Sequence, residues 1–369
     1  GLGVVRLDRI GDFVLATPAL RFLYDHVDEP VTLIGHELWK ELALWLNEHH
    51  IAGGPLFDSF VGIRPETFTS PRAFADAARQ LTPYARLLQM ASSRTNGVDK
   101  LIATAPGEKT APAGDTANTL SMQRRLNNRL YDQVLDAPHA DIEYERNIEI
   151  VAAFLATEPP HAHPPLWSIP KELREAALRD VAEKTQQPIA PGFIALNPYT
   201  SVPLKNWPQE RFVSLINTIT QNHPDMTIVL LGAPEDRSRS ESLTASLARG
   251  KEVVNAVGKT SLVELGALLP QASLLISGDT AAPHLASAVG CNTVVILGGR
   301  QHGRFFPYPA PHGGRSNQFV SHGLPCNPCV RRCRLVKTTS DAAPCIAQVT
   351  ADAVYDAARE VLSTPRLER

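Results

Sequence analysis

The sequence has no apolar run approaching the ~20 residues that a membrane-spanning helix needs. It also has little net charge, because 36 Lys and Arg residues oppose 38 Asp and Glu residues and leave −2. A dedicated nucleic-acid-binding protein carries a clear basic excess, so we expect no nucleic-acid partner. The opening residues, GLGVV, show no basic region followed by a long apolar segment, so we expect no signal peptide.

Cysteine is scarce as well, with five residues in a chain of 369. Four of the five fall between Cys326 and Cys345, which is not the pattern of a secreted domain held together by disulfides. We therefore expect a protein of the reducing cytoplasm.

The composition, with 43% apolar and 20% charged residues, is that of a globular protein with enough apolar material for two cores. In the second half, apolar strands are expected at 193–196, 227–232, 253–258, 274–278 and 293–299. Helices are expected between them, at 209–221, 236–248, 261–269 and 281–289. This alternation predicts a parallel sheet that is covered on both faces.

The first half also reads as an α/β domain. Strands are expected at 4–7, 31–35 and 100–103, and a helix at 70–90. Thr17 and Pro18 are typical of a helix start, with Thr17 as the N-cap.

Proline-rich stretches at 158–165 and 186–192 flank a charged helix and indicate a linker. We therefore expect an N-terminal Rossmann-like domain over 1–185, a C-terminal one over 186–350, and a last helix within 351–369. In such a pair of domains the ligand site is expected in a central cleft, at the carboxyl ends of the strands.

Three loops at successive strand ends predict a binding site for a diphosphate. Asp279, Thr280 and Ala281 lead into a helix, whose unpaired N–H groups attract phosphate, and His284 on its first turn adds a donor. The alternative is that Asp279 or Thr280 only caps the helix.

The second loop, after the strand at 193–196, carries Thr200, Ser201 and Lys205. The hydroxyls can donate to a diphosphate and Lys205 can offset its charge. The alternative for Lys205 is a solvated loop lysine.

In the third loop, Glu235 or Asp236 can bind ribose hydroxyls or cap the following helix. Arg304 follows the last strand and can contact phosphate or sugar.

Asp12 comes just after the first strand, in the segment RLDRIGDFVLATPAL. Asp12 can cap a helix, mark a phosphate loop or act as a general base.

These motifs together resemble glycosyltransferase family 9, the heptosyltransferase family of lipopolysaccharide assembly. The resemblance rests on Gly11-Asp12, on the Lys205-Asn-Trp-Pro loop, on residues 258–262 and on Gly278-Asp-Thr with His284. Two positions differ from the family pattern: Ala281 and Tyr199 stand where the family usually has glycine.

The resemblance implies a GT-B fold and an inverting transferase without a catalytic cofactor. It implies that Asp12 is the general base, that the C-terminal domain binds a nucleotide-diphosphate sugar, typically ADP-heptose, and that the N-terminal domain binds a glycolipid or glycan acceptor. Peripheral association with the inner membrane, at its cytoplasmic face, follows from such an acceptor. The alternatives are a transferase using another nucleotide sugar, a sugar-nucleotide epimerase with His284 and His302 as acid–base groups, or an inactive scaffold.

The remaining motif is CNPCVRRC followed by a later cysteine. A tetrahedral site for zinc or iron can be formed by four thiolates, those of Cys326, Cys329, Cys333 and Cys345. We expect a structural metal ion, and the alternative is a loop of free thiols.

Overall fold

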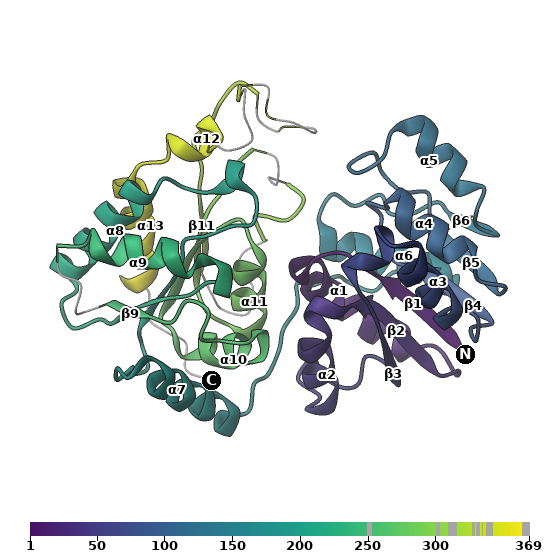
Figure 1. Ribbon diagram of the computed structural model, residues 1–369, viewed down its shortest axis with the longest axis horizontal. Helices are drawn as coiled ribbons and strands as arrows, with labels where there is room; N and C mark the ends of the chain where they lie inside the picture. Colours follow the sequence, from purple (N-terminus) through teal and green to yellow (C-terminus); the bar gives the residue numbers. More distant parts are fainter. Residues whose placement is uncertain are drawn as a thin grey trace. The chain divides into compact units, whose positions relative to one another are not determined.

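We describe a computed structural model that covers residues 1–248, 253–299, 303–308, 316–326, 329, 333, 335–336 and 342–363. The chain divides into two compact units, Gly1–Pro165 and Leu166–Arg369 (Figure 1). Among the described residues, no helix is long and apolar enough to cross a membrane.

Unit 1 is a six-stranded parallel sheet with the strand order β3-β2-β1-β4-β5-β6. Its strands are β1 (Leu2–Arg6), β2 (Val31–His36), β3 (Ser59–Ile63), β4 (Arg86–Gln89), β5 (Glu108–Pro112) and β6 (Gln133–Leu135). Its helices are α1 (Ile10–Tyr24), α2 (Lys40–Glu48), α3 (Pro71–Gln80), α4 (Asn96–Ala103), α5 (Ser121–Asn128) and α6 (Glu143–Leu155).

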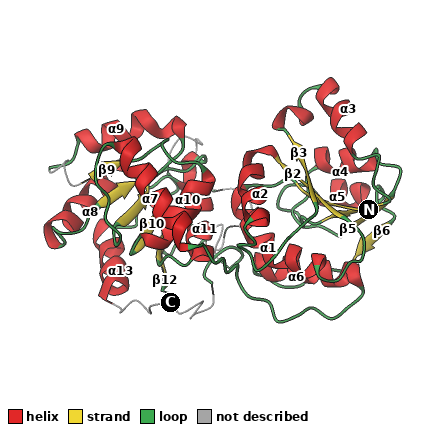
Figure 2. Cartoon of the chain, turned by 90° about the horizontal axis from the view of Figure 1, so that it is seen from below, coloured by secondary structure: helices red, strands yellow, loops and turns green. Residues whose placement is uncertain are grey.

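Unit 2 repeats the same plan, with the order β12-β11-β10-β7-β8-β9. Its strands are β7 (Ile194–Asn197), β8 (Ile228–Leu230), β9 (Val253–Asn255), β10 (Leu274–Gly278), β11 (Thr293–Ile296) and β12 (Asn317–Val320). Its helices are α7 (Lys171–Thr185), α8 (Gln209–Asn222), α9 (Arg237–Ala245), α10 (Leu262–Leu268), α11 (Ala281–Val289), α12 (Pro344–Ala347) and α13 (Ala351–Ser363). Figure 2 shows the helices of each unit arranged around its strands.

Counted within each unit, both sheets have the strand order 3-2-1-4-5-6 of the doubly wound dinucleotide-binding folds. The central strands are buried on both faces, as the apolar runs in the sequence predicted.

The two units meet in sequence between Pro165 and Leu166, whereas the proline-rich segments led us to expect a boundary after residue 185. Helix α7 packs against α10, so the charged helix belongs to unit 2. Helix α13 packs against α8 and β12, and it is therefore part of unit 2 as well.

Helix α1 does not start at Pro18 as expected, but at Ile10, directly after β1. Pro18 lies inside the helix and has no N–H to donate to the carbonyl of Val14. The Thr17 hydroxyl donates to that carbonyl instead, at 2.8 Å. The helix therefore continues through the proline, and Asp12 lies in its first turn.

Two local predictions in unit 1 are also wrong. Residues 86–89, placed in a helix, form β4, and residues 100–103, placed in a strand, end helix α4. The β4 residues pair with the buried strand β1, and such tertiary pairing overrides the local pattern.

Candidate functional site

The strand orders fix where side chains can gather in each unit. In a doubly wound sheet, ligands bind beyond the carboxyl ends of the two central strands, from which the chain turns to opposite sides. These strands are β1 and β4 in unit 1, and β7 and β10 in unit 2. Asp12 follows β1, Lys205 lies in the loop after β7, and Asp279 follows β10.

In unit 2, the loops after β7 and β10 are joined by an ion pair. The Lys205 ammonium donates to Asp279 Oδ2 at 2.6 Å. Asp279 is buried and Lys205 is about three-quarters buried. The pair therefore fixes the lysine beyond the carboxyl ends of the two central strands, β7 and β10. Lys205 is therefore not a freely solvated loop residue.

Thr280 is the N-cap of α11, so the capping role of this residue is observed. Its hydroxyl oxygen accepts from the amide of Ala282 at 3.3 Å and from Asn197 Nδ2 at 3.3 Å. Ala281 is the first residue of the helix. The arrangement leaves an N-terminal helix turn beside the Lys205–Asp279 pair, which suits an anion.

His284 is buried on α11 behind this turn. Its ring stacks on Phe306, with centroids 4.4 Å apart and an interplanar angle of 11°, and its Nδ1 bonds to the Tyr308 hydroxyl. Burial, with a smaller effect of the charge on Lys205, lowers the pKa of His284 to about 3. The imidazole is therefore neutral, and it can donate or accept a hydrogen bond without bringing a charge.

Phe306 and Tyr308 are site residues that the sequence reasoning missed. Both follow β11 in the sequence. His302, considered as an acid–base group, lies outside the described residues. Arg304 lies over the ring of Phe305, with its guanidinium carbon 5.3 Å from the centroid.

The Thr200 hydroxyl, which we predicted would bind the diphosphate, forms a hydrogen bond within its own loop instead. The Thr200 hydroxyl donates to the carbonyl of Val202 at 2.7 Å, and the Thr200 amide donates to Asn206 Oδ1 at 2.8 Å. These bonds hold the loop that ends in Lys205. Ser201 is exposed at the tip of this loop.

The third loop places Glu235 and Asp236 in a single 3-10 turn before α9. Asp236 accepts from the amide of Ala233 at 3.3 Å and pairs with Arg239 at 3.3 Å, so it acts as a cap. Glu235 is exposed. The guanidinium of Arg239 lies over the ring of Tyr199 at 4.4 Å, and burial raises the pKa of this tyrosine to about 12.

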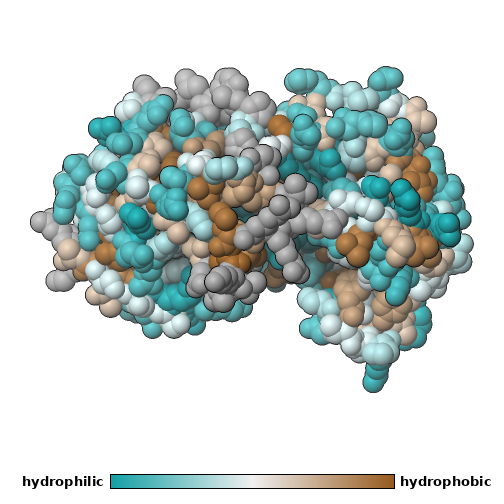
Figure 3. Space-filling view, turned by 90° about the horizontal axis from the view of Figure 1, so that it is seen from above, coloured by the Kyte–Doolittle hydropathy of each residue, from teal (hydrophilic) through white to brown (hydrophobic). Residues whose placement is uncertain are grey.

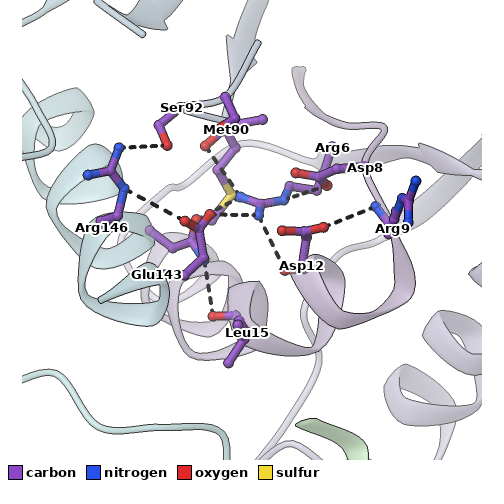
Figure 4. Close-up of polar contacts among 12 residues, drawn as sticks. Arg6, Asp8, Arg9, Asp12, Leu15, Met90, Ser92, Glu143 and Arg146 are labelled. Carbon is purple, nitrogen blue, oxygen red and sulfur yellow. Dashed lines mark hydrogen bonds and ion pairs between the residues drawn. The ribbon is translucent and has the colours of Figure 1, made fainter. Parts of the chain in front are cut away.

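In unit 1, Asp12 lies in the first turn of α1, where its Oδ2 accepts from the backbone amide of Arg9 at 3.3 Å (Figure 4). The capping interpretation is thus observed, and it is compatible with a second role. The bond orients the carboxylate at the carboxyl end of β1.

Beneath Asp12 lies a fully buried guanidinium, that of Arg6 at the end of β1. It donates to Asp8 Oδ1 at 2.8 Å, to Asn147 Oδ1 at 2.6 Å and to the carbonyl of Asp12 at 3.3 Å. Glu143 Oε1 lies 3.4 Å from the guanidinium, which also donates to the carbonyl of Met90 at 3.4 Å (Figure 4). Glu143 and Asn147 come from α6 and were missed, because a single sequence gives no signal for contacts 137 and 141 residues apart.

The four clustered cysteines are free thiols. Cys329 Sγ lies 3.5 Å from the carbonyl oxygen of Cys326. Burial, with smaller contributions from Cys326, Cys345 and Cys333, raises the pKa of the Cys329 thiol. Within the part of the chain that the structure describes, no three Cys, His, Asp or Glu side chains are arranged to ligate one metal ion.

The family profile described as glycosyltransferase family 9 (heptosyltransferase) matches residues 119–339, which is more than half of the chain. The chain belongs to glycosyltransferase family 9.

A curated relative is lipopolysaccharide heptosyltransferase 3 of Escherichia coli (strain K12), 26% identical over 113 residues. That segment is 30% of this chain and 32% of the relative, so the match spans about a third of the curated protein.

Two solved structures share the fold over nearly the whole chain. The glycosyl transferase family 9 protein of Veillonella parvula DSM 2008 aligns with a TM-score of 0.70 at 16% identity, covering 98% of this chain and 96% of the other. The ADP-heptose lps heptosyltransferase II of E. coli aligns with a TM-score of 0.69 at 14% identity, covering 98% of each chain. The fold is therefore GT-B, with two Rossmann-like domains, as predicted.

Proposed function

We propose that this family 9 protein is an inverting glycosyltransferase that moves heptose from ADP-heptose to a lipopolysaccharide core or related surface glycan. The observation that carries the proposal is the Lys205–Asp279 pair. It lies beside the N-terminal turn of α11, beyond the carboxyl ends of the central strands of the second sheet. The name of the E. coli relative, an ADP-heptose heptosyltransferase, supports the choice of donor.

On the donor side, the leaving group is a nucleoside diphosphate, which carries more negative charge as its bond to the sugar breaks. Lys205 offsets this charge, and the first amides of α11, with Ala281 at the start, donate to the phosphate oxygens. Neutral His284 adds a hydrogen bond from the same helix. Glu235 binds the ribose hydroxyls, since Asp236 is held by its cap. Arg304 and Ser201 contact the phosphate or sugar.

On the acceptor side, Asp12 is the general base. Its carboxylate removes the proton from the acceptor hydroxyl, and the oxygen bonds to the anomeric carbon as the carbon–oxygen bond to the diphosphate breaks. The proton stays on Asp12 until solvent takes it, and the nucleoside diphosphate leaves with the bonding electron pair. Arg6 and the Arg9 amide hold Asp12 in place for this step.

We also propose that the four clustered cysteines hold one structural zinc or iron ion. The support is that four of the five cysteines fall within residues 326–345 and that Cys329 Sγ lies 3.5 Å from the carbonyl oxygen of Cys326. An ion held by four thiolates would join parts of the chain that lie up to 19 residues apart, so we expect metal binding to be coupled to local folding.

A panel of nucleotide sugars tests the proposed activity, with release of nucleoside diphosphate as the readout. We expect release from ADP-heptose that depends on an added lipopolysaccharide-core acceptor. Release from a different nucleotide sugar would show that the donor carries another sugar or another base than ADP-heptose. Conversion of the sugar without transfer would identify an epimerase, and no reaction with any donor would identify a scaffold.

A further inference from the structure

A cluster of aromatic rings surrounds His284 on helix α11. The imidazole stacks on Phe306, and the ring centroids of Phe305 and Tyr308 each lie 6.0 Å from its own. Phe306 packs in turn on Phe319 of the edge strand β12, with centroids 5.4 Å apart. The neighbouring rings therefore fix the orientation of the imidazole, and only the position of its single N–H proton remains to be set.

This aromatic cluster lies beneath the surface of unit 2. Phe306 is 2% exposed, and His284 and Tyr308 are each 5% exposed. Teal polar residues cover much of this unit in the space-filling view, on the left of Figure 3. A buried donor or acceptor cannot exchange its partner for water, so each imidazole nitrogen needs a defined hydrogen-bond partner.

The first imidazole nitrogen, Nδ1, is bonded to the hydroxyl of Tyr308. A neutral imidazole carries its proton on one nitrogen and accepts with the other, and the bond that one nitrogen makes decides between the two forms. A phenol is a stronger acid than the N–H of a neutral imidazole, and a bare imidazole nitrogen is a stronger base than a phenol oxygen. The Tyr308 hydroxyl is therefore the donor, which leaves the proton of His284 on Nε2.

The second nitrogen, Nε2, faces away from Tyr308, because the two nitrogens lie on different edges of the ring. Within the described part of the chain, no group forms a hydrogen bond with Nε2 of His284. The nearby charge is that of Lys205, which after burial is the second cause of the lowered pKa of His284. Nε2–H is thus a donor that still needs a partner, on the helix whose first turn lies beside the Lys205–Asp279 pair.

We propose that Tyr308 is a positioning residue, whose hydroxyl holds His284 in the tautomer that donates from Nε2 to the diphosphate of the bound nucleotide sugar. The identity of this ligand rests on the proposed function, whereas the tautomer does not. Ionised phosphate oxygens accept hydrogen bonds, so the other tautomer would turn a lone pair toward them. Lys205 supplies the positive charge of the site, and His284 supplies an uncharged donor of fixed direction.

NMR spectroscopy of the full chain with isotope-labelled histidine tests the tautomer without any ligand. Cross peaks between ring nitrogens and ring protons show which nitrogen is protonated, and the peaks that His284→Gln lacks are those of His284. At neutral pH we expect the Nε2–H form in the wild type and a mixture of both forms in Tyr308→Phe, which keeps the ring without the hydroxyl. Tyr355→Phe is the matched control, because the Tyr355 hydroxyl lies 3.4 Å from Nε2 of His223 in the same unit, and it should leave the His284 peaks unchanged. A proton on Nδ1 in the wild type, or the same tautomer in wild type and Tyr308→Phe, would overturn the proposal.

Calorimetric titration of ADP tests the consequence for binding. Tyr308→Phe should weaken ADP binding roughly 2- to 10-fold, the range expected for one uncharged hydrogen bond, and Tyr355→Phe should bind ADP like the wild type. In His284→Gln protein the Tyr308→Phe substitution should have little further effect, because the tyrosine acts through the histidine. Equal losses with and without His284 would show that Tyr308 contributes only by packing, and would overturn its positioning role. A wild type that binds no ADP would contradict the proposed donor, and the NMR spectra would still decide the tautomer.

Discussion

The ammonium of Lys205 lies 2.6 Å from the carboxylate of Asp279, although the two residues are 74 positions apart in the sequence. The pair joins the ends of β7 and β10, the two strands between which the order of the second sheet reverses. A lysine held here by a buried carboxylate is oriented before any ligand arrives. Preorganised charge of this kind stabilises a developing anion without a cost of reorganisation.

Replacing Lys205 with alanine should therefore weaken ADP binding. A hydrogen bond to a charged group contributes about 1.5–3 kcal/mol, which is roughly 10- to 150-fold in Kd. Calorimetric titration of ADP into wild type and variant measures the effect. Lys184→Ala is the control, because Lys184 forms an ion pair with Glu264 at the surface of the same unit. Equal affinity in the wild type and Lys205→Ala would remove Lys205 from the site.

The buried imidazole of His284 should make stability depend on pH. Its folded-state pKa of about 3 lies below the ordinary 6.5, so the unfolded chain binds the extra proton between these values. The contribution to stability is complete above pH 6.5 and is lost as the pH falls toward 3. Between pH 7.5 and pH 5 the wild type should lose about 2 kcal/mol of unfolding free energy through this group.

Urea unfolding of the wild type and of His284→Gln at the two pH values checks this. Glutamine keeps a polar group without titrating, so the variant should lose less stability than the wild type on acidification. Equal losses in both proteins would show that His284 is protonated in the folded state.

The Arg6–Glu143 contact should be a stability determinant of unit 1. Arg6 is fully buried, and replacing Glu143 removes one of the two carboxylates that compensate its charge. We expect Glu143→Gln to lower the free energy of unfolding by roughly 3 kcal/mol. Glu145→Gln on the same helix is the control, because Glu145 is only half-buried and accepts from Tyr144. Equal stability of the two variants would show that Asp8 and Asn147 alone satisfy Arg6.

The cysteine cluster gives a prediction that does not depend on the enzyme activity. Purified protein should carry about one zinc or iron ion per chain, as a closed four-thiolate site requires. Cys329→Ser should lower both the metal content and the melting temperature, whereas Cys291→Ala, at a buried thiol outside the cluster, should leave the metal content unchanged. Metal-free protein of undiminished stability would contradict the proposed ion.

The second unit could be predicted from the sequence almost element by element. Strands such as Ile194–Asn197 and Leu274–Gly278 are buried on both faces, so each appears as a short apolar run that ends in polar residues. The edge strand Asn317–Val320 was missed, because it is only half-buried and lacks this signal.

The elements of the first unit were harder to predict from the sequence, and the reasons can be identified. Pro18 suggested a helix start, since the sequence does not show that the Thr17 hydroxyl satisfies the carbonyl left by the proline. The residues that we predicted to lie in loops after strands, such as Lys205 and Asp279, do lie there in the structure. Tyr308 and Glu143 were missed, because their importance comes from contacts with His284 and Arg6 that only the fold brings about.

The central claim is that Asp12 is the base of a glycosyl transfer, and Asp12→Asn tests it most directly. Asparagine keeps an oxygen that can accept from the Arg9 amide, so the helix start is preserved while the basicity is lost. The measurement is nucleoside diphosphate release from ADP-heptose with acceptor present, alongside ADP titration and thermal melting. We predict release slowed by roughly 10²–10⁴-fold, with ADP affinity and melting temperature unchanged. Release near the wild-type rate from a variant that melts earlier would contradict the account and leave Asp12 as a helix cap.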